Sequence, residues 1–184
     1  MTDPAPGTLL IAEPPMADPN FKRSVILLCE HDEEQGSFGL VLNRPAEFRL
    51  AEVANRPLPF DAPLAFGGPV QLDTLHYVHP YGDVVEGALP LVDDVFWGGQ
   101  FESLLEGMEK GWLNADRFRF FVGYSGWGPG QLRAELDEKS WIVVPASAEI
   151  VFAESDDALW RALLRRMGGE LALLSTFPDD PRLN

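Results

Sequence analysis

Apolar residues in the first quarter of the chain fall in short, nearly continuous runs and not at helical spacing. Residues 8–13, 24–31 and 37–45 are rich in Leu, Ile and Val and are separated by Pro, Gly or acidic residues. Runs of this kind are typical of strands that are covered on both faces. The acidic segment between the second and third runs predicts the tip of a hairpin.

Strands are also expected later in the chain. Arginine and phenylalanine alternate in the segment RFRFFVG, as on a strand that is exposed on one face. The apolar segment SWIVVPA contains Pro145, which closes a strand. Together with shorter apolar runs, this pattern predicts strands at residues 74–79, 117–123, 140–146, 149–154 and 170–175.

Helical signals lie between and after these runs. Apolar residues recur on one helix face from Phe101 to Trp112, and Gly111 ends this predicted helix. Residues 130–138 predict a short helix with Pro129 in its first turn. A last helix is expected to begin at a capping Ser155 and to end near a glycine pair. One helical turn fits in the segment LAEVANRPLP before its prolines.

Composition supports an ordinary folded protein with a strongly acidic surface. The chain has 184 residues, of which 46% are apolar, enough for one core. Strands and helices alternate without a regular βαβ rhythm, which favours a mixed α+β fold in a single domain over residues 1–184, with residues 1–7 as a flexible tail. The formal charge of −15, from 29 acidic and 14 basic residues, opposes binding to nucleic-acid backbones and anionic membranes.

Cysteine content and the N-terminus indicate the compartment. Cys29 is the only cysteine and lies in an apolar run, so it is interpreted as a small hydrophobe in a reducing environment. The N-terminal residues lack the basic and apolar regions of a signal peptide. No stretch approaches the roughly 18 apolar residues of a membrane helix. We therefore expect a cytoplasmic protein without a membrane partner.

The segment GYSGWGPGQL, from Gly123 to Leu132, is the most distinctive in the chain. A nucleophile elbow needs a second glycine where Trp127 stands, and a dinucleotide loop needs one where Gln131 stands. A phosphate loop needs a lysine, which the segment lacks. The segment is therefore interpreted as a strand-to-helix turn. Ser125 as a nucleophile, and the backbone N–H groups as an anion site, are the alternatives.

The histidines suggest no metal centre. His76 and His79 form an H-x-x-H pattern, but in a strand residues three apart face opposite sides of the sheet. No metal site is predicted from them. Glu30 and His31 end a strand beside the acidic hairpin tip. The tip is interpreted as a solvated turn, and Glu30 and His31 are kept as candidate binding residues.

Asn43 and Arg44 close the third apolar run. A guanidinium is a planar fork of five donors that suits a carboxylate or phosphate. A turn with a surface arginine is the favoured interpretation, and an anion-binding guanidinium is the alternative.

Taken together, these motifs resemble the YqgE/AlgH family of bacterial proteins. The resemblance covers nearly the whole chain and rests on TLLIAEPPMADPNFKRSVILLCEHDEEQGSFGLVLNRP, FGGPV with LHYVH, FFVGYSGWGPGQLRAEL, SWIVVPA and DALWRALLRRMGG. It implies a small cytoplasmic protein with a bifurcated or partly barrel-like sheet surrounded by helices. It implies no catalytic residue, and part of the family carries a transcriptional-regulator label. The family motif positions in this chain are Met16, Phe21, Glu30, His31, Gly39, Asn43, Pro45, Gly67, Gly68, Pro69, Tyr124, Ser125, Trp127, Gly130, Gln131 and Leu132.

Three functions are compatible with these residues. The first is a binding or regulatory module for a protein partner or small ligand, with no catalytic centre, cofactor or metal. The second is a hydrolase that uses Ser125 with His31 or His76. The third is a DNA-binding regulator, against which the net charge argues. The candidate binding face consists of Glu30, His31, Asn43, Arg44, Gly67, Gly68, Tyr124, Ser125, Trp127 and Gln131.

Overall fold

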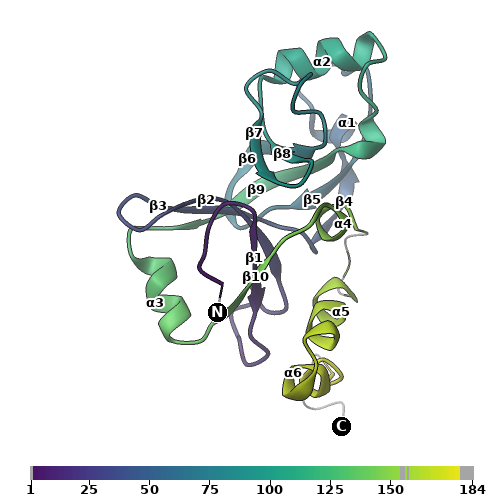
Figure 1. Cartoon of the computed structure of the whole chain (residues 1–184). Helices are drawn as coiled ribbons and strands as arrows, with labels where there is room; N and C mark the ends of the chain where they lie inside the picture. The colour runs from purple at the N-terminus through teal and green to yellow at the C-terminus, as the bar shows by residue number, and fades with distance from the viewer. Residues whose placement is uncertain (1, 154–155, 157, 179–184) are drawn as a thin grey trace.

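The computed structural model describes residues 2–153, 156 and 158–178, and its strands form one branched sheet with helices around it (Figure 1). The strands are β1 (Thr8–Ala12), β2 (Val25–Asp32), β3 (Gly36–Val41), β4 (Pro45–Arg49), β5 (Pro63–Phe66), β6 (Val70–His79), β7 (Leu89–Val92), β8 (Val95–Trp97), β9 (Arg119–Trp127) and β10 (Trp141–Pro145). The helices are α1 (Leu50–Val53), α2 (Phe101–Glu109), α3 (Gln131–Asp137), α4 (Ala148–Val151), α5 (Ala158–Met167) and α6 (Gly169–Leu174), with a 3-10 turn at Ala115–Arg117.

The sheet branches at β9. Its main path runs β10-β1-β2-β3-β9-β6-β8-β7, and every neighbouring pair on this path is antiparallel. The first part of β9, Phe120–Val122, pairs with the parallel strand β5, whereas Ser125–Trp127 pairs with β3. Strand β4 pairs with β5. The sheet is not closed, and the expectation of a mixed α+β fold with a bifurcated sheet is confirmed.

The continuous apolar runs reflect burial on both faces of the first strands. In β1, Leu9 and Ile11 face one core cluster, and Leu10 and Ala12 face another. All four side chains are fully buried. Alternation between polar and apolar residues is absent from β1 because neither of its faces meets water.

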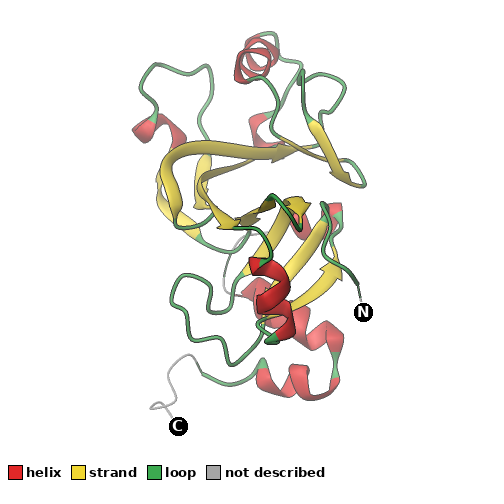
Figure 2. Cartoon of the chain, turned by 90° about the vertical axis from the view of Figure 1, so that its left-hand side faces the viewer, coloured by secondary structure: helices red, strands yellow, loops and turns green. Residues whose placement is uncertain are grey.

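Each face of the sheet is covered by a different helix. Helix α5 covers one face through Trp160 and Leu164, and the Trp160 indole donates a hydrogen bond to the Ala12 carbonyl oxygen at 2.8 Å. Helix α3 covers the other face through Leu132. Helix α2 places Leu104 over a separate cluster at the opposite end of the molecule from α5 and α6 (Figures 1 and 2).

Two predicted strands are helices in the structure. The segment predicted at 149–154 begins as α4, because the Ser147 hydroxyl accepts a hydrogen bond from the Ile150 N–H at 3.4 Å and caps a helical turn. The segment predicted at 170–175 is α6, which follows a backbone reversal at Gly168, where φ is 74°. Short apolar runs cannot be assigned from periodicity alone, and both predictions were wrong for this reason.

The glycine-rich segment also differs from its prediction. Strand β9 extends through Trp127, so Tyr124–Trp127 is strand and only 128–130 forms the turn. Gly130 is the N-cap of α3 with φ of 70°, and Pro129 precedes the helix instead of lying in its first turn. The predicted Ser155 cap lies outside the described residues.

Residues near the N-terminus are tied to the sheet. The Gly7 N–H donates to the Leu28 carbonyl oxygen at 2.9 Å, and the Gly7 carbonyl oxygen accepts from the Ala146 N–H at 3.1 Å. The segment predicted to be a flexible tail is thus hydrogen-bonded to the sheet at Gly7. None of the helices in the described ranges is long and apolar enough to cross a membrane.

Candidate functional site

Trp127 and Gln131 help to hold helix α3 on the sheet. The indole N–H groups of Trp127 and Trp141 donate to Oε2 of Glu135 at 2.9 Å and 2.7 Å. The Gln131 amide donates to the other oxygen of Glu135 at 2.8 Å and accepts from the Gly128 N–H at 3.0 Å. Sequence reasoning missed Glu135, although it lies one helical turn after Gln131. We call this group the Glu135 clamp.

Ser125 is fully buried and makes an internal hydrogen bond. Its hydroxyl donates to the Gly67 carbonyl oxygen at 3.1 Å. A Cβ on Gly67 would lie 2.3 Å from the Gly123 carbonyl oxygen, and one on Gly68 would lie 2.2 Å from the carbonyl carbon of Tyr124. The two glycines are therefore required because the turn between β5 and β6 packs directly on the backbone of β9.

Asn43 is also a structural residue. It is fully buried, and its side chain accepts from the Val25 N–H and donates to the Arg23 carbonyl oxygen, both at 2.8 Å. The Asn43 side chain thus provides the acceptor for the N–H of the first residue of β2 and a donor for a carbonyl oxygen just before this strand.

Arg44 lies on a groove of about 330 Å³. Its guanidinium donates to the carbonyl oxygens of Lys22 and Asn43, which hold it in place. The groove is lined by Pro19, Asn20, Val41, Arg44, Phe66, Gly68, Pro69 and Leu72. Its walls are mostly apolar, and Arg44 supplies the charge.

A second groove, of about 360 Å³, shares Leu72 with the first. Leu72 lies on a bulge of β6 between Val70 and Leu75, where Gln71 has a φ of 45°. The side chain of Leu72 is 55% exposed and that of Val53, on the second groove, is 49% exposed. The second groove is lined by Leu50, Val53, Ala54, Asn55, Arg56, Leu58, Leu72, Asp73, Thr74, Leu75, Phe101 and Val122. We call the two grooves together the Leu72 surface.

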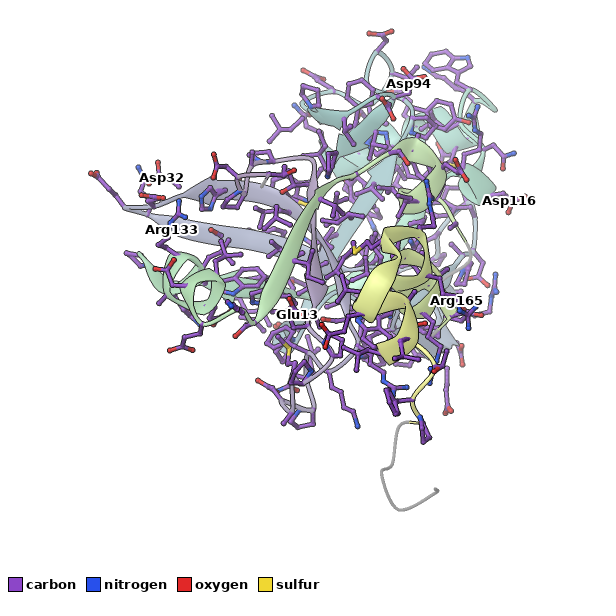
Figure 3. All side chains as sticks on the ribbon, turned by 60° about the horizontal axis from the view of Figure 1, so that its bottom comes forward. Glu13, Asp32, Asp94, Asp116, Arg133 and Arg165 are labelled. Carbon is purple, nitrogen blue, oxygen red and sulfur yellow. The ribbon has the colours of Figure 1, made fainter. Side chains whose placement is uncertain are left out.

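Glu30 and His31 lie on a different, polar pocket at the end of the β2–β3 hairpin. Its volume is about 460 Å³, and Trp127 and Phe38 contribute to its wall. Nδ1 of His31 lies 2.8 Å from the Ser37 hydroxyl, its cross-strand neighbour. The hairpin tip is held against α3 by an ion pair between Glu33 and Arg133 at 3.0 Å, and Figure 3 shows Arg133 below Asp32 at this tip. We call this site the hairpin pocket.

Tyr124 belongs to a half-buried group of rings beside the hairpin pocket. It stacks on Phe38 with ring centroids 4.6 Å apart, and His76 contacts both rings at 5.7 Å and 5.0 Å. Nε2 of His76 donates to the Thr74 hydroxyl at 3.0 Å, because that hydroxyl donates its own proton to the Gln71 carbonyl oxygen. Burial lowers the pKa of His76.

His79 faces the opposite side of β6, as predicted, and is fully buried. Its Nε2 lies 2.8 Å from the Gly98 carbonyl oxygen, and its Nδ1 accepts from the Tyr81 N–H. This pattern requires the neutral ring with the proton on Nε2. Within the described ranges, no cluster of three or more His, Cys, Asp or Glu side chains could hold a metal ion.

The ten residues of the predicted binding face therefore separate into different environments. The pairing of Ser125 with His31 or His76 is not formed, since each of the three bonds another group. The Leu72 surface contains Arg44 and Gly68. The hairpin pocket is lined by Glu30, His31 and Trp127, and Tyr124 lies beside it. Three residues are buried, namely Asn43, Gly67 and Ser125, and Gln131 is part of the Glu135 clamp.

Comparison with known proteins gives consistent matches over the length of the chain. The model of a family described as AlgH-like matches residues 9–172. A UPF0301 protein of Chlorobium limicola is 44% identical over 179 residues, which cover 97% of this chain and 95% of that protein. A UPF0301 protein of Cytophaga hutchinsonii is 41% identical over 179 residues, with 97% and 98% covered.

Two solved structures share the fold. The crystal structure of a protein from Corynebacterium diphtheriae has a TM-score of 0.79 at 31% sequence identity, with 96% of this chain and 94% of that chain covered. The solution structure of the AlgH protein from Pseudomonas aeruginosa has a TM-score of 0.72 at 34% identity, with 98% of each chain covered. Both similarities extend over nearly the whole chain.

Proposed function

The chain belongs to the AlgH-like family, and we propose that it is a non-catalytic binding module that engages a partner protein through the Leu72 surface. The observation that carries this proposal is Leu72 itself. It is a large apolar side chain, 55% exposed, on a bulge between two grooves. Exposed apolar side chains that occur singly need no explanation, but one flanked by two grooves with largely apolar walls is typical of an interaction site.

The composition of the grooves favours a protein partner. Phe66, Leu58 and Phe101 provide apolar walls, and Arg44 provides a positioned guanidinium. Aromatic residues and arginine are enriched among the side chains that contribute most to protein interfaces. Hydrogen bonds to two carbonyl oxygens already hold Arg44, so little side-chain entropy is lost on binding. The partner segment would carry an apolar side chain and a nearby carboxylate.

Site-specific photo-crosslinking tests this proposal. A photoreactive p-benzoylphenylalanine at position 72 should give a discrete adduct with one protein in native cytoplasm. The same residue at Val84, which is 40% exposed but lines neither groove, is the matched control and should not give that adduct. Adding Arg44→Glu to the position-72 variant should reduce the adduct yield. The same adducts from both positions, or none from position 72, would refute the proposal.

A second candidate function is ester hydrolysis at Ser37, which is favoured by its 2.8 Å contact with Nδ1 of His31 in the hairpin pocket. A nucleophile and a base at this distance are the minimum for covalent catalysis. Nε2 of His31 has no hydrogen-bond partner in the described part of the chain, so no carboxylate orients the ring as in a triad. For this reason we rank it second.

Labelling with a fluorophosphonate separates the two candidates. If Ser37 is a nucleophile, mass spectrometry should find the label on the peptide that contains Ser37, and His31→Asn should abolish it. The Leu72 proposal expects no such label on the folded protein.

A further inference from the structure

Arg119 begins β9 at the point where the sheet branches. Nη1 donates to the Val151 carbonyl oxygen at 2.7 Å, and Nη2 donates to the Leu42 carbonyl oxygen at 2.6 Å. These bonds connect β9 to the end of α4 and to the residue that follows β3. A guanidinium has five N–H donors, so three of them have no acceptor within the described ranges.

In the described part of the chain, no acidic side chain balances the charge of Arg119. Among the residues that the structure describes, no carboxylate oxygen lies within 4.0 Å of its guanidinium. Burial lowers the pKa of Arg119 to about 10, which leaves the side chain charged at neutral pH. Arg119 is half-buried; a charge partly withdrawn from water without a counter-charge is unfavourable, and an anion next to it would offset this cost.

A cavity of about 260 Å³ lies against Arg119. Its other lining residues are Pro45, Pro63, Leu64, Ala65, Phe118 and Phe120. Arg119 is the only charged residue in this lining, and every other wall is apolar. The volume equals roughly nine water molecules at about 30 Å³ each, which is enough for a small organic molecule.

We propose that this cavity binds a small monocarboxylate with a short apolar chain. The carboxylate meets the remaining donors of Arg119, since a guanidinium matches a carboxylate in a two-point arrangement. The apolar chain lies against Leu64 and Phe120. A phosphate dianion fits less well because a single guanidinium among apolar walls would neutralise only part of its charge. The site shares no lining residue with the Leu72 surface, and so stands independently of the proposed function.

Titration of the intact protein with sodium butyrate at constant ionic strength tests the proposal. The NMR signal of the Arg119 Nε–H should shift in a saturable manner, and the Tm should rise with butyrate concentration, because a ligand that binds only the folded state stabilises it. Butanamide has the same size and shape without the charge and should produce neither effect. No saturable shift at tens of millimolar butyrate, or an equal response to butanamide, overturns the proposal.

Three variants locate the effect. Ala65→Leu adds bulk at a lining residue of the cavity that is also part of the core; in the variant that circular dichroism shows to be folded, the butyrate response should be lost. Arg119→Lys keeps the charge but loses the planar fork, and should weaken butyrate binding by about tenfold or more. Arg133→Gln removes an exposed arginine of α3 and should bind as the wild type does. If Arg119→Lys does not fold, the comparison of butyrate with butanamide on the wild type tests whether the carboxylate is recognised. An unchanged affinity of folded Ala65→Leu for butyrate also overturns the proposal.

Discussion

Removing the Glu135 carboxylate should destabilise the protein by loss of two partly buried hydrogen bonds. Trp127 and Trp141 are each 5% exposed, and both indole N–H groups donate to Oε2 of Glu135. A buried donor left without an acceptor costs about 1–3 kcal/mol. The Gln131 amide is on an exposed residue and can turn to water. Two such donors give about 2–6 kcal/mol. Because Glu135 is itself half-buried, water can reach part of the site, and we expect the lower end of this range, about 2–3 kcal/mol, for Glu135→Ala.

Urea unfolding followed by far-UV circular dichroism measures this loss. Tryptophan fluorescence is unsuitable because the substitution changes the surroundings of two indoles. A loss of about 2–3 kcal/mol corresponds to a fall in Tm of about 5–10 °C for a chain of this size. Glu135→Gln keeps one acceptor oxygen and should lose about 1 kcal/mol. Glu138→Ala, at an exposed position that ends the same helix, should change the free energy of unfolding by less than about 0.5 kcal/mol. A loss below that value in Glu135→Ala would refute the clamp.

Three further outcomes are expected. Burial lowers the pKa of both His76 and His79 in the folded protein, whereas in the unfolded chain their pKa is about 6.5. As pH falls, the unfolded chain therefore binds more protons than the folded one. The free energy of unfolding should therefore decrease as pH falls through about 6.5 and level off below the lowered pKa values; a His76→Gln, His79→Gln double variant should lack this decrease in urea titrations at successive pH values. The Ser24 hydroxyl is fully buried without a hydrogen-bond partner among the described residues. Ser24→Ala should therefore leave the free energy of unfolding in urea unchanged or raise it by about 1 kcal/mol. A clear fall in this free energy would reveal a partner such as a trapped water. Burial raises the pKa of Cys29 well above its usual value, so an aromatic disulfide reagent should titrate this thiol only after unfolding, and fast reaction of the native protein would contradict its burial.

Sequence patterns predicted the elements whose burial is strongest. The runs that became β1, β2 and β3 are buried on both faces, so they are apolar throughout and recognisable without alternation. Helix α2 was recognisable because only one of its faces is buried. Strands β7 and β8 were not predicted, since they are four and three residues long and partly exposed. Helices α4 and α6 were mistaken for strands because four to six residues are too few to show a helical period.

The candidate site was harder to predict because β9 serves several sites at once. Alternate residues of a strand face opposite sides, so neighbours in the glycine-rich segment contribute to different surroundings: Ser125 is buried, and Tyr124 lies in the ring group. Val122, three residues before Ser125, lines one groove of the Leu72 surface, and Arg119 lines the proposed carboxylate cavity. A contiguous motif suggested one face, whereas the branch of the sheet distributes its residues over several. That branch depends on the pairing of β9 with β3 and β5, which are far from it in sequence. Apart from the hairpin pocket, the grooves and the cavity described above are therefore formed next to the motif, by Leu72, Arg44 and Arg119. Leu72 and Arg44 are the residues at which substitution should separate binding from folding.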